Sequence, residues 1–110
     1  MLTEIYEGFT ITLEAVQSDQ SIAELYAGSE ATSYSVGEIE AAVDIGDMLH
    51  FRAKVTCSRG GIVLSCEYLD GCIYDTLEDF KNNSDYYADM RATVLHDARA
   101  AIIALHKEDA

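Results

Sequence analysis

Three cysteines and three histidines are the residues of this 110-residue sequence that most readily carry metal or nucleophilic chemistry. Structural zinc sites usually hold pairs of ligands two to four residues apart, as in C-x-x-C. Here eight and five residues separate the successive cysteines, and two of the three fall in strand-like segments. The spacing favours buried structural thiols, so we predict no metal site and no cofactor. The six residues are Cys57, Cys66, Cys72, His50, His96 and His106.

The catalytic candidates are one cysteine and one histidine–aspartate pair. Cys72 lies in a predicted loop, YLDGCIYD, between two aspartates. Neighbouring negative charge raises the pKa of a thiol, which is the opposite of what a thiolate nucleophile needs. His96 and Asp97 adjoin in a predicted helix, and we expect them to point to different faces and to form no dyad. We therefore predict that the chain is not an enzyme. A small enzyme is the least favoured of three functional hypotheses.

Carboxylates supply the remaining chemistry. The sequence holds 20 Asp and Glu against 7 Lys and Arg, which gives a net charge of −13 and a pI near 4.3. Ten of the acids lie in residues 1–51, where there is no Lys or Arg at all. Such a charge opposes direct binding to nucleic acid or to an anionic membrane, and it favours solubility or attraction to a basic partner surface.

Two acidic patches are the predicted partner-binding residues. Glu40 and Asp44 are four residues apart, as are Asp85 and Asp89, which on a helix places their Cβ atoms about 5–6 Å apart. The phosphates of one nucleic-acid strand advance about 3.4 Å per nucleotide, so rows of carboxylates can imitate them in a basic groove. The alternative is an ordinary solvated acidic face. The predicted set is Glu38, Glu40, Asp44, Asp47, Asp75, Glu78, Asp79, Asp85 and Asp89.

Strands that alternate apolar and polar residues must help to position these acids. Residues 8–16 alternate in this way, and so do residues 49–57 and 62–68 on either side of a turn at Gly60-Gly61. Two alternating runs around such a turn predict a hairpin. Pairing across the turn is expected to place Cys57 and Cys66 on the same buried face.

Four helices complete the predicted fold. We expect them over residues 18–28, 35–46, 76–80 and 85–107. A capping box of Ser35 and Glu38 begins the second of these helices and Gly46 ends it, and Ser84 is the expected cap of the last. The last helix carries an apolar face made of Tyr87, Met90, Val94, Ala98, Ala101, Ile102 and Leu105.

The order of elements predicts the fold class. The order β-α-α-β-β-α-α indicates a single α+β domain over residues 1–110, with a small antiparallel sheet of about three strands and helices packed on one face. Seven tyrosines lie among acids rather than among bases. We expect Tyr68, Tyr74 and Tyr87 in or near the core, and Tyr26, Tyr34 and Tyr86 either there or at an interface.

The compartment follows from what the sequence lacks. The N-terminal residues contain no basic segment followed by an apolar run, and no stretch approaches the roughly 18 apolar residues of a membrane-spanning helix. An odd number of cysteines suits a reducing compartment. We therefore expect a cytoplasmic protein.

A short acidic single-domain chain without an enzyme motif resembles the inhibitors of host defence encoded by phages and mobile elements. These are the anti-CRISPR proteins and the anti-restriction DNA mimics. Residues 60–90, GGIVLSCEYLDGCIYDTLEDF and then SDYYADM, are also similar to small phage proteins. The resemblance carries over no individual residue. It implies action in the host cytoplasm on a nucleic-acid-handling complex such as a CRISPR effector or a restriction enzyme.

Two functional hypotheses follow. The first is a non-enzymatic inhibitor whose acidic surface occupies a basic nucleic-acid-binding groove. The second is an acidic structural or regulatory interaction module, for example a homodimer, in which the charge serves solubility only. An acidic contact surface would favour the first hypothesis and an apolar contact surface the second.

Overall fold

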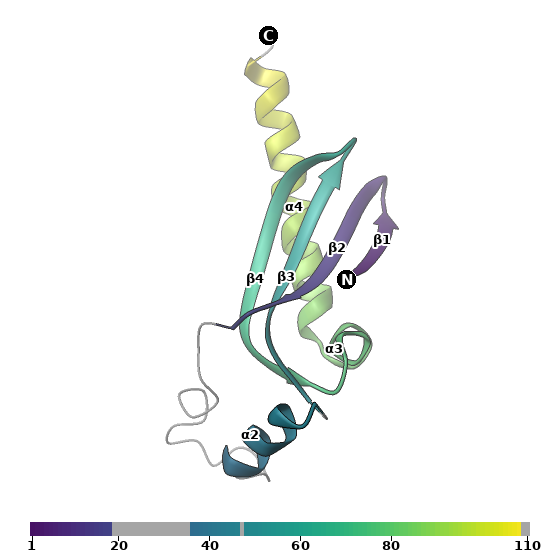
Figure 1. The fold of residues 1–110 in the computed structure, drawn as a ribbon. Helices are drawn as coiled ribbons and strands as arrows, with labels where there is room; N and C mark the ends of the chain where they lie inside the picture. Colours follow the sequence, from purple (N-terminus) through teal and green to yellow (C-terminus); the bar gives the residue numbers. More distant parts are fainter. Residues whose placement is uncertain (19–35, 47, 109–110) are drawn as a thin grey trace.

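A four-stranded antiparallel sheet organises the chain (Figure 1). The computed structural model describes residues 1–18, 36–46 and 48–108. Within these ranges the elements follow the order β-β-α-β-β-α-α, and each strand pairs with the next along the chain. The elements are β1 (Leu2–Tyr6), β2 (Phe9–Val16), α2 (Val36–Asp44), β3 (Leu49–Arg59), β4 (Ile62–Tyr74), α3 (Leu77–Asn83) and α4 (Tyr86–Glu108).

The α+β class is confirmed, whereas the predicted strand number and order are wrong. Strand β1 precedes the strand predicted over residues 8–16, and the two form a hairpin closed by Glu7 and Gly8, both with positive φ. This conformation is typical of two-residue hairpin turns. The sequence pattern hides β1 because Glu4 lies opposite the buried Ile11, on the side of the sheet that faces the core.

Helices α3 and α4 cover one face of the sheet and enclose the core. Phe80 of α3 packs edge-on against Phe51 and Tyr74, with ring centroids 5.8 and 5.2 Å apart. From α4, Val94 is fully buried, and Ser65 of β4 donates a hydrogen bond to its carbonyl oxygen at 2.6 Å. The large side chains with almost no exposure are Phe80, Ile11, Leu13, Val55, Val94 and Cys57.

An irregularity in the β3–β4 hairpin reverses the faces predicted for β4. The register shifts by one residue next to Cys57, which therefore lies opposite Ser65, while Cys66 lies opposite Thr56. A shift of one residue turns every following side chain to the other face. The prediction that Cys57 and Cys66 share a buried face is wrong, because Cys57 is buried and Cys66 is exposed. Tyr68, expected near the core, is likewise exposed.

The predicted hairpin is longer than its pattern indicates. Strand β4 continues through Asp70 and Gly71 to Tyr74, so the predicted loop around Cys72 is part of a strand. A second register shift, between Phe51 and Ala53 on β3, accommodates this stretch.

The described helices agree with three of the four predicted ones, whereas the predicted helix 18–28 lies almost wholly outside the described residues. Helix α2 ends at Asp44, two residues before the predicted end at Gly46, which lies in the following turn with a positive φ. Thr76 caps α3, accepting a hydrogen bond from the main-chain N–H of Asp79 at 3.0 Å. Ser84 was predicted to cap α4 but instead closes α3, because its hydroxyl donates a hydrogen bond to the Phe80 carbonyl.

Helix α4 extends beyond the sheet at its C-terminal end (Figure 1). Tyr87, Met90, Val94 and Ala98 of its predicted apolar face are buried, but Leu105 is 52% exposed. The molecule is correspondingly elongated, with extents of 57 × 25 × 20 Å. No helix among the described residues is sufficiently long and apolar to cross a membrane.

Candidate functional site

The predicted acids gather at one end of the molecule, which we call the acidic pole. Helix α2 leads into the start of β3, and α3 follows the end of β4; these strand ends lie side by side, because Leu49 pairs with Tyr74. Helix α4 begins at the same end (Figure 1). The acidic pole consists of Glu38, Glu40, Asp44, Asp75, Glu78, Asp79, Asp85 and Asp89, while Asp47 lies outside the described residues.

Most carboxylates of the acidic pole face solvent, and few basic residues lie in the segments that carry them. All but Asp79 are exposed, and Asp79 accepts a hydrogen bond from the Asn83 side chain at 2.7 Å. Segments 36–46 and 75–89 contain one basic residue, Lys81. Its ammonium group lies 3.7 Å from a carboxylate oxygen of Glu4, outside the pole. Glu38 apart, no acid of the pole is ion-paired with a basic side chain in the described part of the chain.

Other acids, by contrast, are neutralised by the chain itself. Glu4 accepts hydrogen bonds from the Tyr87 hydroxyl at 2.6 Å and the Arg91 guanidinium at 3.1 Å, besides facing Lys81. Burial raises the pKa of the Glu4 carboxyl, but these hydrogen bonds and positive charges outweigh burial and lower the pKa below its ordinary value. Burial and the bond to Glu4 raise the pKa of Tyr87. The N-terminal half contains no Lys or Arg, and at Glu4 its negative charge is therefore balanced by basic side chains of α3 and α4.

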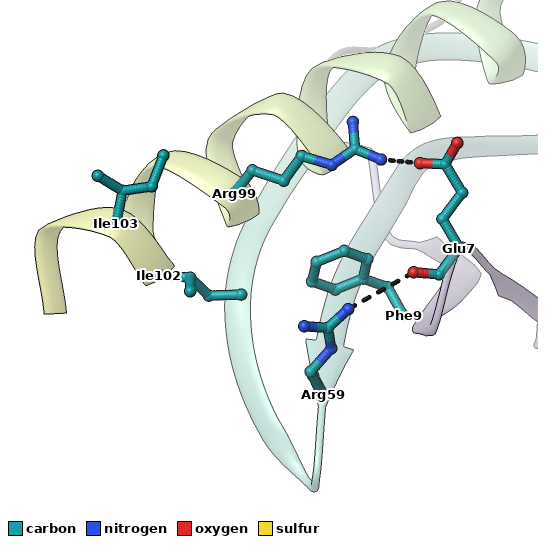
Figure 2. A pocket seen from close by; sticks show the side chains of 6 residues that line it. All are labelled: Glu7, Phe9, Arg59, Arg99, Ile102 and Ile103. Atoms are coloured by element: carbon teal, nitrogen blue, oxygen red, sulfur yellow. Dashed lines mark hydrogen bonds and ion pairs between the residues drawn. The ribbon is translucent and has the colours of Figure 1, made fainter. Parts of the chain in front are cut away.

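A hollow of about 380 Å³ lies between the β1–β2 turn, the end of β3 and α4 (Figure 2). The Glu7 carboxylate pairs with Arg99 of α4. The Arg59 guanidinium stacks on the Phe9 ring at 3.8 Å and donates to the main-chain carbonyls of Glu7 and Gly8. Ile102 and Ile103 of α4 form the apolar wall. Sequence analysis missed this site, because its residues come from segments about 50 and 90 positions apart.

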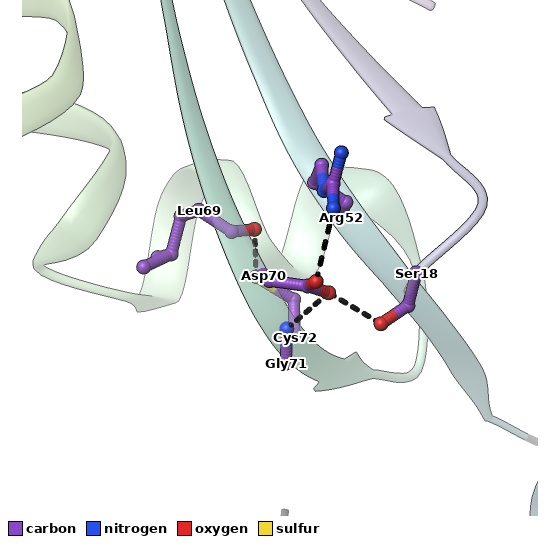
Figure 3. Close-up of polar contacts among 6 residues, drawn as sticks. All are labelled: Ser18, Arg52, Leu69, Asp70, Gly71 and Cys72. Atoms are coloured by element: carbon purple, nitrogen blue, oxygen red, sulfur yellow. Dashed lines mark hydrogen bonds and ion pairs between the residues drawn. The ribbon is translucent and has the colours of Figure 1, made fainter. Parts of the chain in front are cut away.

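Asp70 and Cys72 form a structural contact rather than a nucleophilic site (Figure 3). The Asp70 carboxylate accepts hydrogen bonds from Ser18, from the main chain of Gly71 at 2.8 Å and from Arg52 at 3.3 Å. The Cys72 thiol is buried and donates to the Leu69 carbonyl at 3.4 Å. Burial, together with the charge of Asp70, raises the pKa of this thiol, which keeps it protonated.

A small hollow of about 140 Å³ adjoins Cys72. Its other lining residues include Tyr74 and Tyr86, and none of the described residues that line it is a histidine. The hollow therefore supplies a protonated thiol with no neighbouring imidazole base, which is a poor arrangement for nucleophilic catalysis.

The histidines show no catalytic arrangement within the described residues. The prediction that His96 and Asp97 point apart is wrong, because His96 Nδ1 lies 3.3 Å from Asp97 Oδ1. Both side chains are exposed on α4, which suits a surface contact. His50 lies on β3 with its Nε2 buried and without a hydrogen-bond partner among the atoms described. The described residues also hold no group of three or more His, Cys, Asp or Glu placed to bind a metal ion.

Comparison with protein-family models, with curated protein sequences and with solved structures finds no match to this chain.

Proposed function

We propose that the chain is a non-enzymatic inhibitor that binds the basic nucleic-acid-binding groove of a host defence complex, such as a CRISPR effector or a restriction enzyme, through the acidic pole. The observation that carries the proposal is the gathering of three acidic segments at one end, where seven carboxylates, those of the pole other than Glu38, form no ion pair with a basic side chain among the described residues. On this proposal the chain acts in the cytoplasm of the host.

The separation of two kinds of acid supports this proposal over charge that serves solubility alone. Glu4, Glu7 and Asp70 lie beside basic side chains of the chain itself, as an acid that stabilises the fold should. Glu40 and Asp44 instead stand one helical turn apart on an exposed surface, where like charges oppose helix formation. A basic partner would relieve that repulsion and would attract the acidic pole over long range.

Competition with DNA tests the proposal. Purified CRISPR effector complexes and restriction enzymes would be titrated with the protein, and displacement of labelled target DNA would be measured between 50 and 500 mM salt (about 14 to 4 Å of screening length). We expect displacement by at least one complex, with an affinity that falls steeply as salt rises. A lack of binding to every complex, or an affinity that is flat with salt, would contradict the proposal.

A matched pair of charge reversals locates the contact. Asp44→Lys and Asp97→Lys change the net charge equally, but Asp97 lies on α4 about 12 Å along the helix axis from Asp89. We expect Asp44→Lys to weaken binding about 10- to 100-fold, and Asp97→Lys to weaken it less than about threefold. Equal losses in the two variants would show that net charge alone, and not the acidic pole, governs binding.

A further inference from the structure

The end of the molecule opposite the acidic pole exposes apolar side chains, and we call it the apolar end. Ile103 and Leu105 of α4 are 55% and 52% exposed, and Ile62 at the start of β4 is 65% exposed. Ile62 lies opposite Arg59 in the strand register, and Arg59 lines the same hollow as Ile102 and Ile103 (Figure 2). The apolar end therefore consists of Ile62, Ile102, Ile103 and Leu105 around the hollow lined by Glu7, Phe9, Arg59 and Arg99.

The sequence of α4 at this end is that of a covered helix. Residues 100–105 read AAIIAL and contain no polar side chain on any side. A helix that is apolar all round is normally buried, whereas one that borders solvent has a polar face. In this structure the apolar face of α4 continues past the sheet to Leu105. Leu105 is about half exposed, so the described residues do not cover this part of the face.

The charged groups beside the hollow are complementary to the same groups of a second copy of the chain. Among the described residues, no carboxylate lies within ion-pair distance of the Arg59 guanidinium, which is held in place by Phe9 and two main-chain carbonyls. The Glu7 carboxylate binds Arg99 through Oε2, and its Oε1 has no partner among the residues that the structure describes. Each copy thus brings one incompletely paired carboxylate and one arginine without an acid, which a two-fold axis can join twice.

We propose that the apolar end is the interface of a symmetric homodimer, with the C-terminal part of α4 packed against its counterpart and Glu7 of each copy paired with the partner's Arg59. The charge distribution favours a second copy of the chain as the partner and determines how the two copies are oriented. Contact through this end leaves the two acidic poles at the outer ends of the dimer. Their separation then exceeds by several-fold the screening length of about 8 Å at physiological salt, whereas contact through the poles would bring like charges together. This dimer does not depend on the proposed inhibitory function.

Sedimentation velocity of the full chain, at concentrations from about 1 to 300 μM, tests the dimer. We expect Ile103→Asp to raise the dimer dissociation constant at least about 30-fold, since it places a charge in the centre of the contact. Ile45→Asp is the matched control, because Ile45 is 73% exposed beside the acidic pole; it should leave the constant unchanged. Circular dichroism would confirm that both variants fold. A monomer at every concentration, or a dimer that Ile103→Asp leaves intact, overturns the proposal.

Charge reversal tests the pairing across the two-fold axis. Arg59→Glu and Glu7→Arg should each be monomeric alone, because each places two pairs of like charges in the interface. An equal mixture of the two variants restores both opposite-charge pairs and should form a heterodimer. Recovery of a dimer only in the mixture supports the Glu7–Arg59 contact, and two monomers in the mixture overturn it. Native mass spectrometry would detect a small molecule bound to a monomer in the hollow, which would also overturn the dimer.

Discussion

At the scale of single residues, Glu4 differs from every acid of the acidic pole. Its side chain is 25% exposed and contacts Tyr87, Arg91 and Lys81, which belong to two other elements. These contacts attach the edge strand β1 to α3 and α4. Removing one partner from such a cluster leaves other charges partly buried and unpaired, which is costly.

Glu4→Gln should therefore lower the free energy of unfolding at pH 7 by about 2 kcal/mol. The pKa of Glu4 is lower in the fold than its ordinary value of 4.5, so its stabilising contribution is present above that value and is lost as the pH falls through the lowered one. Urea unfolding at pH 7, 5, 4 and 3 should show wild type and variant converging below about pH 4.5. Glu40→Gln, at an exposed position, should cost nothing. A difference that persists unchanged at pH 3 would contradict the role of the charge.

At the scale of elements, the short helix α3 brings two acids, Glu78 and Asp79, to the acidic pole. It spans seven residues, so its own hydrogen bonds stabilise it little. Two features hold it in place: Phe80 packed in the aromatic cluster, and the Thr76 hydroxyl, which satisfies the otherwise unpaired N–H of Asp79. Both contacts come from residues adjoining the acids, so the position of the acids depends on them.

Thr76→Ala should lower the free energy of unfolding by about 1 kcal/mol, because it leaves the N–H of Asp79 without its acceptor. Thr93→Ala is the matched control. Thr93 is exposed within α4, and alanine favours a helix more than threonine does. Urea denaturation of both variants measures the difference. Similar values for the two would mean that the Thr76 hydroxyl does not act as a cap.

The elements also show what could be predicted from the sequence. Regular alternation located β2 and most of the β3–β4 hairpin, and helical periodicity located α2 and α4; of the predicted caps of these two helices, Ser84 closes α3 instead and Ser35 lies outside the described residues. Strand β1 was missed because its position facing the core holds Glu4, whose partners lie about 80 residues away. The register shift beside Cys57 leaves no mark on the pattern of residue types, so Cys66 and Tyr68 were placed on the wrong face. The acids of the pole could be identified from residue type, whereas their gathering depends on strand pairing.

At the scale of the whole molecule, charges of opposite sign are separated along its length. The acidic pole occupies one end, and Arg59 and Arg99 line a hollow with Ile102 and Ile103 towards the other (Figure 2). Repulsion within the pole opposes the compact state. Screening should therefore stabilise this molecule, although salt also weakens its exposed ion pairs.

Raising NaCl from 20 to 500 mM (about 20 to 4 Å of screening length) should increase the free energy of unfolding by about 1 kcal/mol. The double variant Glu40→Gln/Asp44→Asn should gain less, because it has already lost part of the repulsion. Urea midpoints at each salt concentration provide the measurement. A loss of stability with salt, equal in both proteins, would show that the ion pairs outweigh the repulsion within the pole.

The contact between Glu4 and Arg91 also affects the order in which the chain can fold during synthesis. The ribosome makes β1 and β2 first, but the cations that neutralise Glu4 emerge 77 and 87 residues later. At about 5–20 residues per second, this delay is roughly 4–17 s. Throughout that time the nascent β1–β2 hairpin has neither the apolar surface of α4 nor a partner for its core-facing carboxylate. The N-terminal strands should therefore join the fold only when α4 arrives, which makes the last helix the step that commits the nascent chain to its structure.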